Sequence, residues 1–192
     1  PRLRAQLVVL VLASALPPFQ SAAAQTLTLS SATIEDLNAA FDAGTLTSER
    51  LIELYLARIE AYDQRGPALN AVLHLNAGAL AAARALDAER RATGPRSPLH
   101  GIPVVLKDNI DTSDMPTTAG SLLLAGSIPP DDAFQVRRLR EAGAILLGKT
   151  NMHELGAGVT GLNPHHGPAR NPYDPTRLTG GSSSATAAAV AA

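Results

Sequence analysis

Apolar residues recur every three or four positions in three segments of the first half of the chain, and this period predicts helices. The first predicted helix follows Thr33 as its N-cap and closes at Gly44, and the second follows Thr47 and ends before Gly66. The third is the alanine-rich stretch 77–92. Leu80 and Leu86 of this stretch are expected to face inward, and Glu89, Arg90 and Arg91 to face water.

Two short apolar runs in the second half, residues 102–106 and 144–147, predict buried strands. A helical pattern between them opens at Asp131 or Asp132 and ends at Ala142. A strand, a helix and a second strand imply a parallel crossover within a sheet. The predicted fold class is therefore α/β.

The first 24 residues have the pattern of a secretory signal peptide. Two arginines supply a basic start, residues 7–16 form the apolar run LVVLVLASAL, and Ala22 to Ala24 supply the small residues of a cleavage site. The run is too short for a transmembrane helix, which needs about 20 apolar residues. A buried core helix is the alternative, and the two prolines after the run argue against it. We therefore expect cleavage after Ala24 and a periplasmic or secreted protein with no membrane segment in its mature form.

The composition is that of an ordinary globular protein, with 45% apolar and 17% charged residues. The formal net charge is -1 and the basic residues are scattered, so we expect neither a nucleic acid nor an anionic membrane as a partner. The sequence contains no cysteine, which excludes disulfides, thiolate zinc sites and cysteine nucleophiles.

Residues 143–150, GAILLGKT, match the nucleotide-binding pattern of glycine, four residues, glycine, lysine and threonine. A phosphate cradle needs those four residues in a loop that follows a strand and precedes a helix. Here they are Ala-Ile-Leu-Leu, a core strand in their own right, so a nucleotide-binding enzyme is kept only as the least favoured alternative. Lys149 is interpreted as a solvated strand end.

The histidines offer a second motif that we reject. His153 and Glu154 begin like a zinc-protease helix, but the second histidine that such a helix needs is replaced by Ala157. His165 and His166 lie in a Gly/Pro-rich segment and are interpreted as polar loop residues. We expect no metal and no cofactor.

A cluster of glycines and small hydroxyl residues, Thr179 to Ser184, lies at the end of a long segment, residues 156–181, that is predicted to be irregular. A flexible linker is the alternative interpretation of the cluster, but the apolar helical run 185–192 follows it directly. With Lys107 at the end of the strand 102–106, the chain offers an amine and several hydroxyls. A lysine that has lost its proton can activate a serine, and desolvation favours that loss.

Four blocks of the chain together resemble the amidase-signature family in order and spacing. The resemblance covers most of the chain from Ser31 onward and implies a mixed β-sheet surrounded by helices. It also implies that residues 25–192 are the N-terminal portion of a single amidase domain. Two of the blocks are most similar to the bacterial mandelamide and aryl-acetamide hydrolase branch. The blocks are HGIPVVLKDNID at 100–111, GKTNMHEL at 148–155, RNPYDP at 170–175 and GGSS at 180–183.

The resemblance implies a triad of serine, cis-serine and lysine that hydrolyses a small-molecule carboxamide through an acyl-serine intermediate. Lys107 matches the general base of the family. Ser182 matches the bridging serine, whose peptide bond is cis at a cost of roughly 3 kcal/mol. Ser183 matches the neighbouring serine, whose hydroxyl supports the network by donating and accepting at once.

Two features depart from the family pattern. Ser184 and Ala185 stand where the family commonly has glycines, so the turn must tolerate side chains. The nucleophilic serine of the family lies beyond the position that Ala192 occupies, so these 192 residues are expected to lack it and to be inactive alone. A non-enzymatic binding relative with the same fold remains the alternative.

Overall fold

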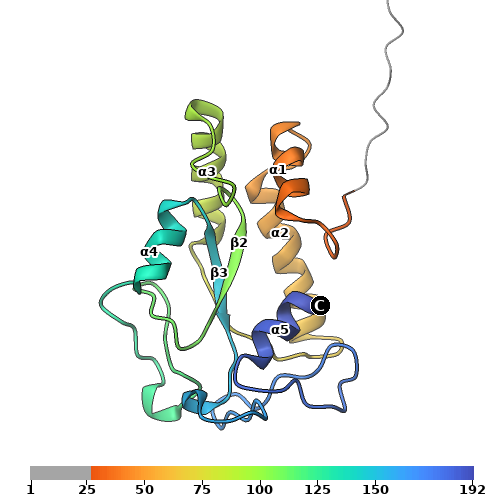
Figure 1. Ribbon diagram of the computed structural model, residues 1–192, viewed down its shortest axis with the longest axis vertical. Coiled ribbons are helices and arrows are strands. Elements are labelled where there is room, and N and C mark those ends of the chain that lie inside the picture. Colours follow the sequence, from red (N-terminus) through yellow and green to blue (C-terminus); the bar gives the residue numbers. More distant parts are fainter. Residues whose placement is uncertain (1–26) are drawn as a thin grey trace, which may run out of the picture.

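The structure is a computed structural model that describes residues 27–192 (Figure 1). The predicted signal peptide, residues 1–24, lies outside the described residues, so its cleavage stays a prediction. None of the helices in residues 27–192 has the length and apolar character of a membrane-spanning segment. In chain order the elements are α1 (Ile34–Asp42), α2 (Ser48–Ile59), the π-helical turn η1 (Glu60–Gln64), β1 (Val72–Leu75), α3 (Ala79–Thr93), β2 (Pro103–Lys107), the 3₁₀ turn η2 (Leu122–Leu124), α4 (Phe134–Glu141), β3 (Ile145–Thr150), the 3₁₀ turn η3 (Glu154–Gly156) and α5 (Ser184–Ala191).

The first two helices begin where the sequence predicts. The Thr33 hydroxyl accepts a hydrogen bond from the Asp36 amide at 3.1 Å, and the Asp36 carboxylate accepts one from the Thr33 amide at 2.9 Å. This reciprocal pair satisfies amides that the first turn of α1 would otherwise leave without partners. The Thr47 hydroxyl accepts from the Arg50 amide at 3.1 Å and caps α2. The third predicted helix corresponds to α3.

Three strands form a mixed sheet in the order β1, β3, β2. Strands β2 and β3 are parallel and α4 lies between them in the chain, so the predicted crossover is confirmed. Strand β1 pairs antiparallel with β3, and its four residues are too few for a pattern in the sequence to have predicted it. The α/β class and the mixed sheet implied by the resemblance are both confirmed.

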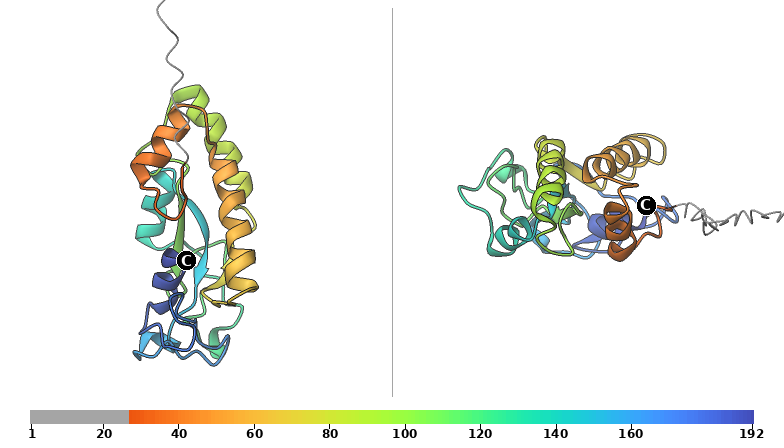
Figure 2. Two further views of the ribbon diagram at one scale, coloured as in Figure 1. Left: turned by 90° about the vertical axis from the view of Figure 1, so that its right-hand side faces the viewer. Right: turned by 90° about the horizontal axis from the view of Figure 1, so that it is seen from above.

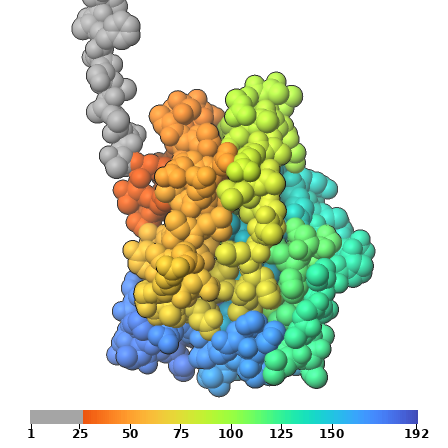
Figure 3. Space-filling view, turned by 180° about the vertical axis from the view of Figure 1, so that it is seen from behind, coloured from red at the N-terminus to blue at the C-terminus, as the bar shows by residue number. Residues whose placement is uncertain are grey.

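Helices cover both faces of the sheet. On one face, Leu147 of β3 packs with Ile52 of α2 and with the inward side of α3. On the other face, Leu146 packs with Val136 of α4. Figure 2 shows the strands between these helices, and Figure 3 shows α2 and α3 covering the back of the molecule. Full burial of each such side chain contributes about 1.5–3 kcal/mol, so the two clusters fix the sheet firmly.

Strand β3 contains an irregularity that changes the direction of its side chains. The pairing with β2 passes from Leu146 to Gly148 as β2 advances by one residue, so Leu147 is an extra residue. Such a β-bulge shifts the alternation of side chains beyond it. Leu146 and Lys149 therefore project to the same face although they are not an even number of positions apart. Glycine is required in the bulge because a Cβ at Gly148 would collide with the carbonyl of His74.

Helix α4 starts later than predicted, and neither Asp131 nor Asp132 caps it. Its N-cap is Ala133, which has no side-chain hydrogen bond to offer. The Asp132 carboxylate instead accepts from the Ser113 amide and from Arg140 Nε, both at 2.8 Å. These contacts tie the loop before α4 to the last turn of the helix, and they leave the carboxylate unavailable as a cap.

The expectation that Arg90 faces water is wrong. Its side chain is 13% exposed and forms an ion pair with Asp42 at 2.9 Å. The guanidinium lies 4.9 Å from the ring centroid of Phe41 and donates to the His100 carbonyl at 3.0 Å. Arginine can cover an aromatic ring with its planar head while its N–H groups reach carbonyls. Arg90 therefore joins α3 to α1.

The long segment between β3 and α5 is irregular apart from η3, as predicted. Figure 1 shows this segment gathered at the end of the molecule toward which β2 and β3 run. Helix α5 corresponds to the predicted apolar run, and its Ala185 and Ala188 pack against Leu69. This packing holds the start of α5 near the carboxyl end of β2.

Candidate active site

Lys107 and Ser182 meet at the carboxyl end of β2. Lys107 Nζ lies 2.7 Å from Ser182 Oγ and donates a hydrogen bond to it. Lys107 is the last residue of β2 and Ser182 lies just before α5, so the contact joins positions 75 residues apart. Both residues are half-buried. The structure thus brings together two of the three site residues predicted from the sequence.

Glycine is needed at each of the two positions before Ser182, for different reasons. Gly180 has φ +86°, a left-handed conformation that residues with a Cβ rarely adopt. Gly181 lies against the backbone of Val159, with which a Cβ would collide. The Ser182 carbonyl then accepts a hydrogen bond from the His153 amide at 3.1 Å. Conformation and close packing together explain the glycine pair.

Ser183, the third predicted site residue, does not join this contact within the described residues. It is the N-cap of α5, it is exposed, and its side chain makes no capping hydrogen bond. Its supporting role stays a prediction.

The peptide bonds of residues 27–192 are all trans, so the cis bond expected at Ser182 is not observed. The trans form is lower in energy by roughly 3 kcal/mol. A cis bond persists only where its surroundings enforce it.

The side chain at Ser184, where the family commonly has glycine, is accommodated. It is buried, and its hydroxyl has no hydrogen-bond partner among the described residues. A Cβ at Gly161 would lie only 2.9 Å from Ser184 Oγ, so the glycine at 161 leaves the space that the hydroxyl occupies. The turn therefore tolerates this departure.

Asp108 is a buried residue beside the site that our interpretation of the motifs did not single out. Its carboxylate accepts hydrogen bonds from the amides of Thr118 and Gly120, each at 3.2 Å, and from the Thr118 hydroxyl. A carboxylate is tolerated in the interior only when its oxygens are paired in this way. These bonds close the chain into a loop, the 108–120 loop, that starts beside Lys107. The sequence signal that could have identified Asp108 was an acidic residue directly after a buried strand.

Lys149 is completely buried, so its interpretation as a solvated strand end is wrong. Its Nζ donates to the carbonyls of Ile110 at 2.8 Å and Pro116 at 3.2 Å, and to the Thr117 hydroxyl at 2.7 Å. Burial lowers the pKa of Lys149, and the surrounding aspartates oppose that shift. The physical reason for the burial is the bulge in β3, which turns Lys149 to the face that the 108–120 loop covers.

The last six of the eight residues that match the nucleotide-binding pattern form β3. All six residues of Ile145–Thr150 are buried, and the strand is paired on both sides. Its amides are therefore not arranged around an anion, as a phosphate cradle requires. The geometry agrees with our rejection of nucleotide binding at this motif.

His165 and His166 lie in a loop, as expected, and both are half-buried. Their ring centroids lie 3.9 Å apart, and His74 lies 6.0 Å from His166. One ring nitrogen of each of the three is buried without a hydrogen-bond partner among the described residues. Burial lowers the pKa of both His74 and His166. Within residues 27–192, no three histidine, aspartate or glutamate side chains are placed to hold a metal ion.

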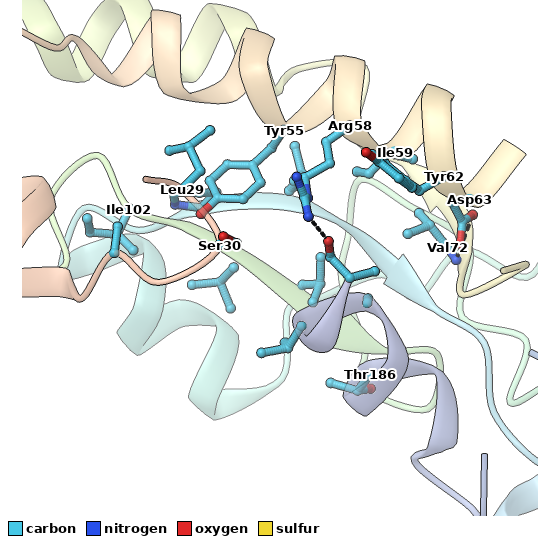
Figure 4. A pocket seen from close by; sticks show the side chains of 18 of the residues that line it. Leu29, Ser30, Tyr55, Arg58, Ile59, Tyr62, Asp63, Val72, Ile102 and Thr186 are labelled. Atoms are coloured by element: carbon cyan, nitrogen blue, oxygen red, sulfur yellow. Dashed lines mark hydrogen bonds between the residues drawn. The ribbon is translucent and has the colours of Figure 1, made fainter. Parts of the chain in front are cut away.

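An apolar cavity of about 440 Å³ lies between α2 and α5 (Figure 4). Arg58 and Ile59 of α2 border it on one side, and Thr186 of α5 lies on the other. Neither Lys107 nor Ser182 lines it. We therefore place the chemistry at the end of β2 and not in this cavity.

The fold is that of an α/β protein with a mixed sheet. Its candidate site pairs a lysine amine at a strand end with a serine that follows two glycines. The sequence matches the Amidase family model over residues 50–192. The chain belongs to the amidase family.

Known relatives agree with this assignment. The chain is 49% identical over 162 residues to a glutamyl-tRNA(Gln) amidotransferase subunit of Acidothermus cellulolyticus, a match that covers 83% of this chain and 31% of the relative. It is 48% identical to the solved peptide amidase of Stenotrophomonas maltophilia, with a TM-score of 0.79 and coverage of 83% and 34%. An amidase family protein of Bacillus anthracis is 42% identical, with a TM-score of 0.78 and coverage of 82% and 32%. The chain thus spans about a third of the length of these relatives.

Proposed function

We propose that the protein containing this chain hydrolyses a carboxamide through an acyl-serine intermediate. Lys107 acts as the general base and Ser182 as the bridging serine, with Ser183 supporting the network. The attacking serine is assigned to a residue outside positions 1–192, following the pattern of the family that the sequence resembles. The proposal concerns the whole protein, since the chain spans about a third of its relatives.

The hydrogen bond between Lys107 and Ser182 is the observation that carries this proposal. A general base must lie within about 2.6–3.2 Å of the atom whose proton it takes, and the 2.7 Å separation meets that condition. In the structure the ammonium donates to Oγ; a neutral amine at the same distance would accept the hydroxyl proton.

The same contact suggests the path of the proton. Ser182 would give its proton to Lys107 while it takes the proton of the attacking serine. When the carbon–nitrogen bond breaks, the path would run in reverse and protonate the departing amine. A water molecule activated by the same groups would then release the acyl group as a carboxylic acid.

The test uses the full-length protein and a primary aryl-acetamide. K107A is expected to lower kcat/KM by about 10²–10⁴-fold, the range for loss of a general base, while thermal unfolding stays close to that of the wild type. R91A, which removes an exposed cation of α3, is the control and should leave kcat/KM unchanged. A K107A protein that keeps full activity would overturn the proposal.

We propose a small-molecule amide as substrate and no nucleic-acid partner. The matched relatives are named as a peptide amidase and as glutamyl-tRNA(Gln) amidotransferase subunits, and an aryl-acetamide remains our own expectation. The net charge of -1 supports the absence of a nucleic-acid partner. So do ion pairs such as those of Arg140 with Asp114 and Asp132, which neutralise arginines in the described part of the chain.

Residues 25–192 alone are proposed to be inactive. Without an attacking serine, the Lys107 and Ser182 pair has no nucleophile to activate. Treatment of this segment with a serine-reactive fluorophosphonate should give no stoichiometric label. A labelled serine together with amide turnover would show that the nucleophile lies within the segment.

A further inference from the structure

Lys149 carries an ammonium group into the interior without an ion-pair partner among the described residues. Its three N–H groups are all donated, and all three acceptors are uncharged oxygens. A buried ammonium is costly, and an apolar side chain of similar length would fill the same space without that cost. Filling the core does not by itself account for a lysine here.

All three acceptors of Lys149 belong to the 108–120 loop. This loop begins directly after Lys107, and Asp108 joins its beginning to its end through Thr118 and Gly120. The Lys149 ammonium lies inside the closed loop and donates hydrogen bonds to its middle part. The position of the peptide that follows Lys107 therefore depends on the Lys149 contacts.

The far end of the 108–120 loop reaches the segment that holds Ser182. The Ala119 carbonyl accepts a hydrogen bond from the Leu155 amide at 2.8 Å, and Ala119 has φ +50°, a conformation that the surrounding contacts must maintain. Two residues before Leu155, the His153 amide donates to the Ser182 carbonyl. Both partners of the Lys107–Ser182 hydrogen bond are thus connected to the loop that Lys149 fixes.

We propose that Lys149 is a positioning residue that sets the separation of Lys107 and Ser182 through the 108–120 loop. This inference rests on the proposed function of that pair. Lys149 does not touch the reacting atoms, and its effect passes through Lys107. Loss of its hydrogen bonds would loosen the loop and lengthen the distance over which the proton moves.

The test compares kcat and KM for an aryl-acetamide in the full-length protein and its variants. K149M keeps the length of the side chain and removes the donors; it is expected to lower kcat about tenfold or more with KM within about twofold. L146A is the matched control, because Leu146 lies in the same strand and on the same face and packs in the cluster that includes Met115 of the loop, but its side chain donates no hydrogen bond to the loop. It should lose thermal stability and keep kcat within about twofold of the wild type.

A second comparison separates positioning from a merely structural role. In a K107A background, K149M should cause no further loss of kcat, because Lys149 acts through Lys107. T117V is the substitute variant if K149M does not fold. It removes one acceptor of Lys149 and should lower kcat about threefold without changing KM.

Three results would overturn the inference while leaving the proposed function intact. The first is a loss of kcat in L146A as large as that in K149M, the second is additive losses of kcat in K107A/K149M, and the third is an unchanged kcat in T117V. A wild-type protein without amide hydrolysis would instead overturn the proposed function, and this inference with it.

Discussion

Lys107 and Lys149 belong to adjacent residue pairs of β2 and β3, and they project to opposite faces of the sheet. Lys107 is the register partner of Thr150, and Lys149 is the partner of Leu106. Successive residues of a strand alternate between faces, so the two pairs face in opposite directions. One amine therefore meets Ser182 and the other enters the 108–120 loop. Substitutions of the two lysines should have different consequences for the same reaction.

Ser182 and Ser183 should differ sharply in their importance. S182A removes the acceptor of the Lys107 hydrogen bond and is expected to lower kcat/KM by about 10²-fold or more in the full-length protein. S183A removes an exposed hydroxyl that bonds nothing among the described residues, and we expect a loss at least tenfold smaller. Steady-state kinetics on the same amide measures both losses of kcat/KM. Equal losses would show that Ser183 is as important to the proton relay as Ser182.

Alanine at Gly180 and at Gly181 should destabilise to different extents. G180A introduces a Cβ into open space at positive φ, which costs about 1–2 kcal/mol. G181A drives a Cβ into the backbone of Val159, so it should lower the free energy of unfolding further and also displace Ser182. Urea denaturation measures the first effect and kcat the second. A G181A protein as stable and active as G180A would contradict this packing.

Acidification should destabilise the protein through His74 and His166. Burial lowers the pKa of both below the ordinary value of 6.5, with Lys149 and His165 reinforcing the shift at His74 and Asp108 opposing it. The unfolded chain then binds more protons than the folded one, so this stabilisation is complete above about pH 6.5 and is lost as the pH falls toward the folded values. Urea unfolding between about pH 7.5 and about pH 5.5 measures the slope.

The matched variant for the pH experiment is H166F, which keeps a ring and cannot be protonated. Its free energy of unfolding should fall less with acidification than that of the wild type. An unchanged slope in H166F would assign the pH dependence to other groups.

Export is expected from residues 1–24. Full-length protein isolated from the periplasm or the medium should begin at Gln25, because Ala22 to Ala24 supply the residues that signal peptidase reads. Mass spectrometry of the N-terminal peptide tests this directly. Protein that stays in the cytosol with its first 24 residues attached would show that the prediction is wrong.

The elements with local signals were predictable from the sequence. The hydroxyls of Thr33 and Thr47 indicate helix starts, and the apolar runs indicate β2 and β3. The start of α4 was not predicted correctly, because the Asp132 carboxylate binds partners outside the first turn of the helix. Strand β1 was missed because its four residues become a strand only by pairing with β3.

The candidate site was predictable only in part. Lys107 and Ser182 came from the family resemblance, since no local pattern relates residues 75 positions apart. Lys149 was misjudged because it was interpreted as the solvated end of an apolar strand, whereas the bulge turns it to the face that the 108–120 loop covers. The glycine at 148 was a hint of a bulge, but the bulge itself depends on pairing with β2 and cannot be read from one strand.

The extra residue in β3 also keeps two like charges apart. If the strand continued in regular register beyond Leu146, Lys149 would replace Thr150 as the direct neighbour of Lys107. Adjacent strands are about 4.8 Å apart, so two ammonium groups would then stand side by side with little water between them. Their mutual repulsion would push one amine away from Ser182 or force it to release its proton. With the bulge present, a threonine hydroxyl stands beside Lys107, and the second ammonium lies across the sheet.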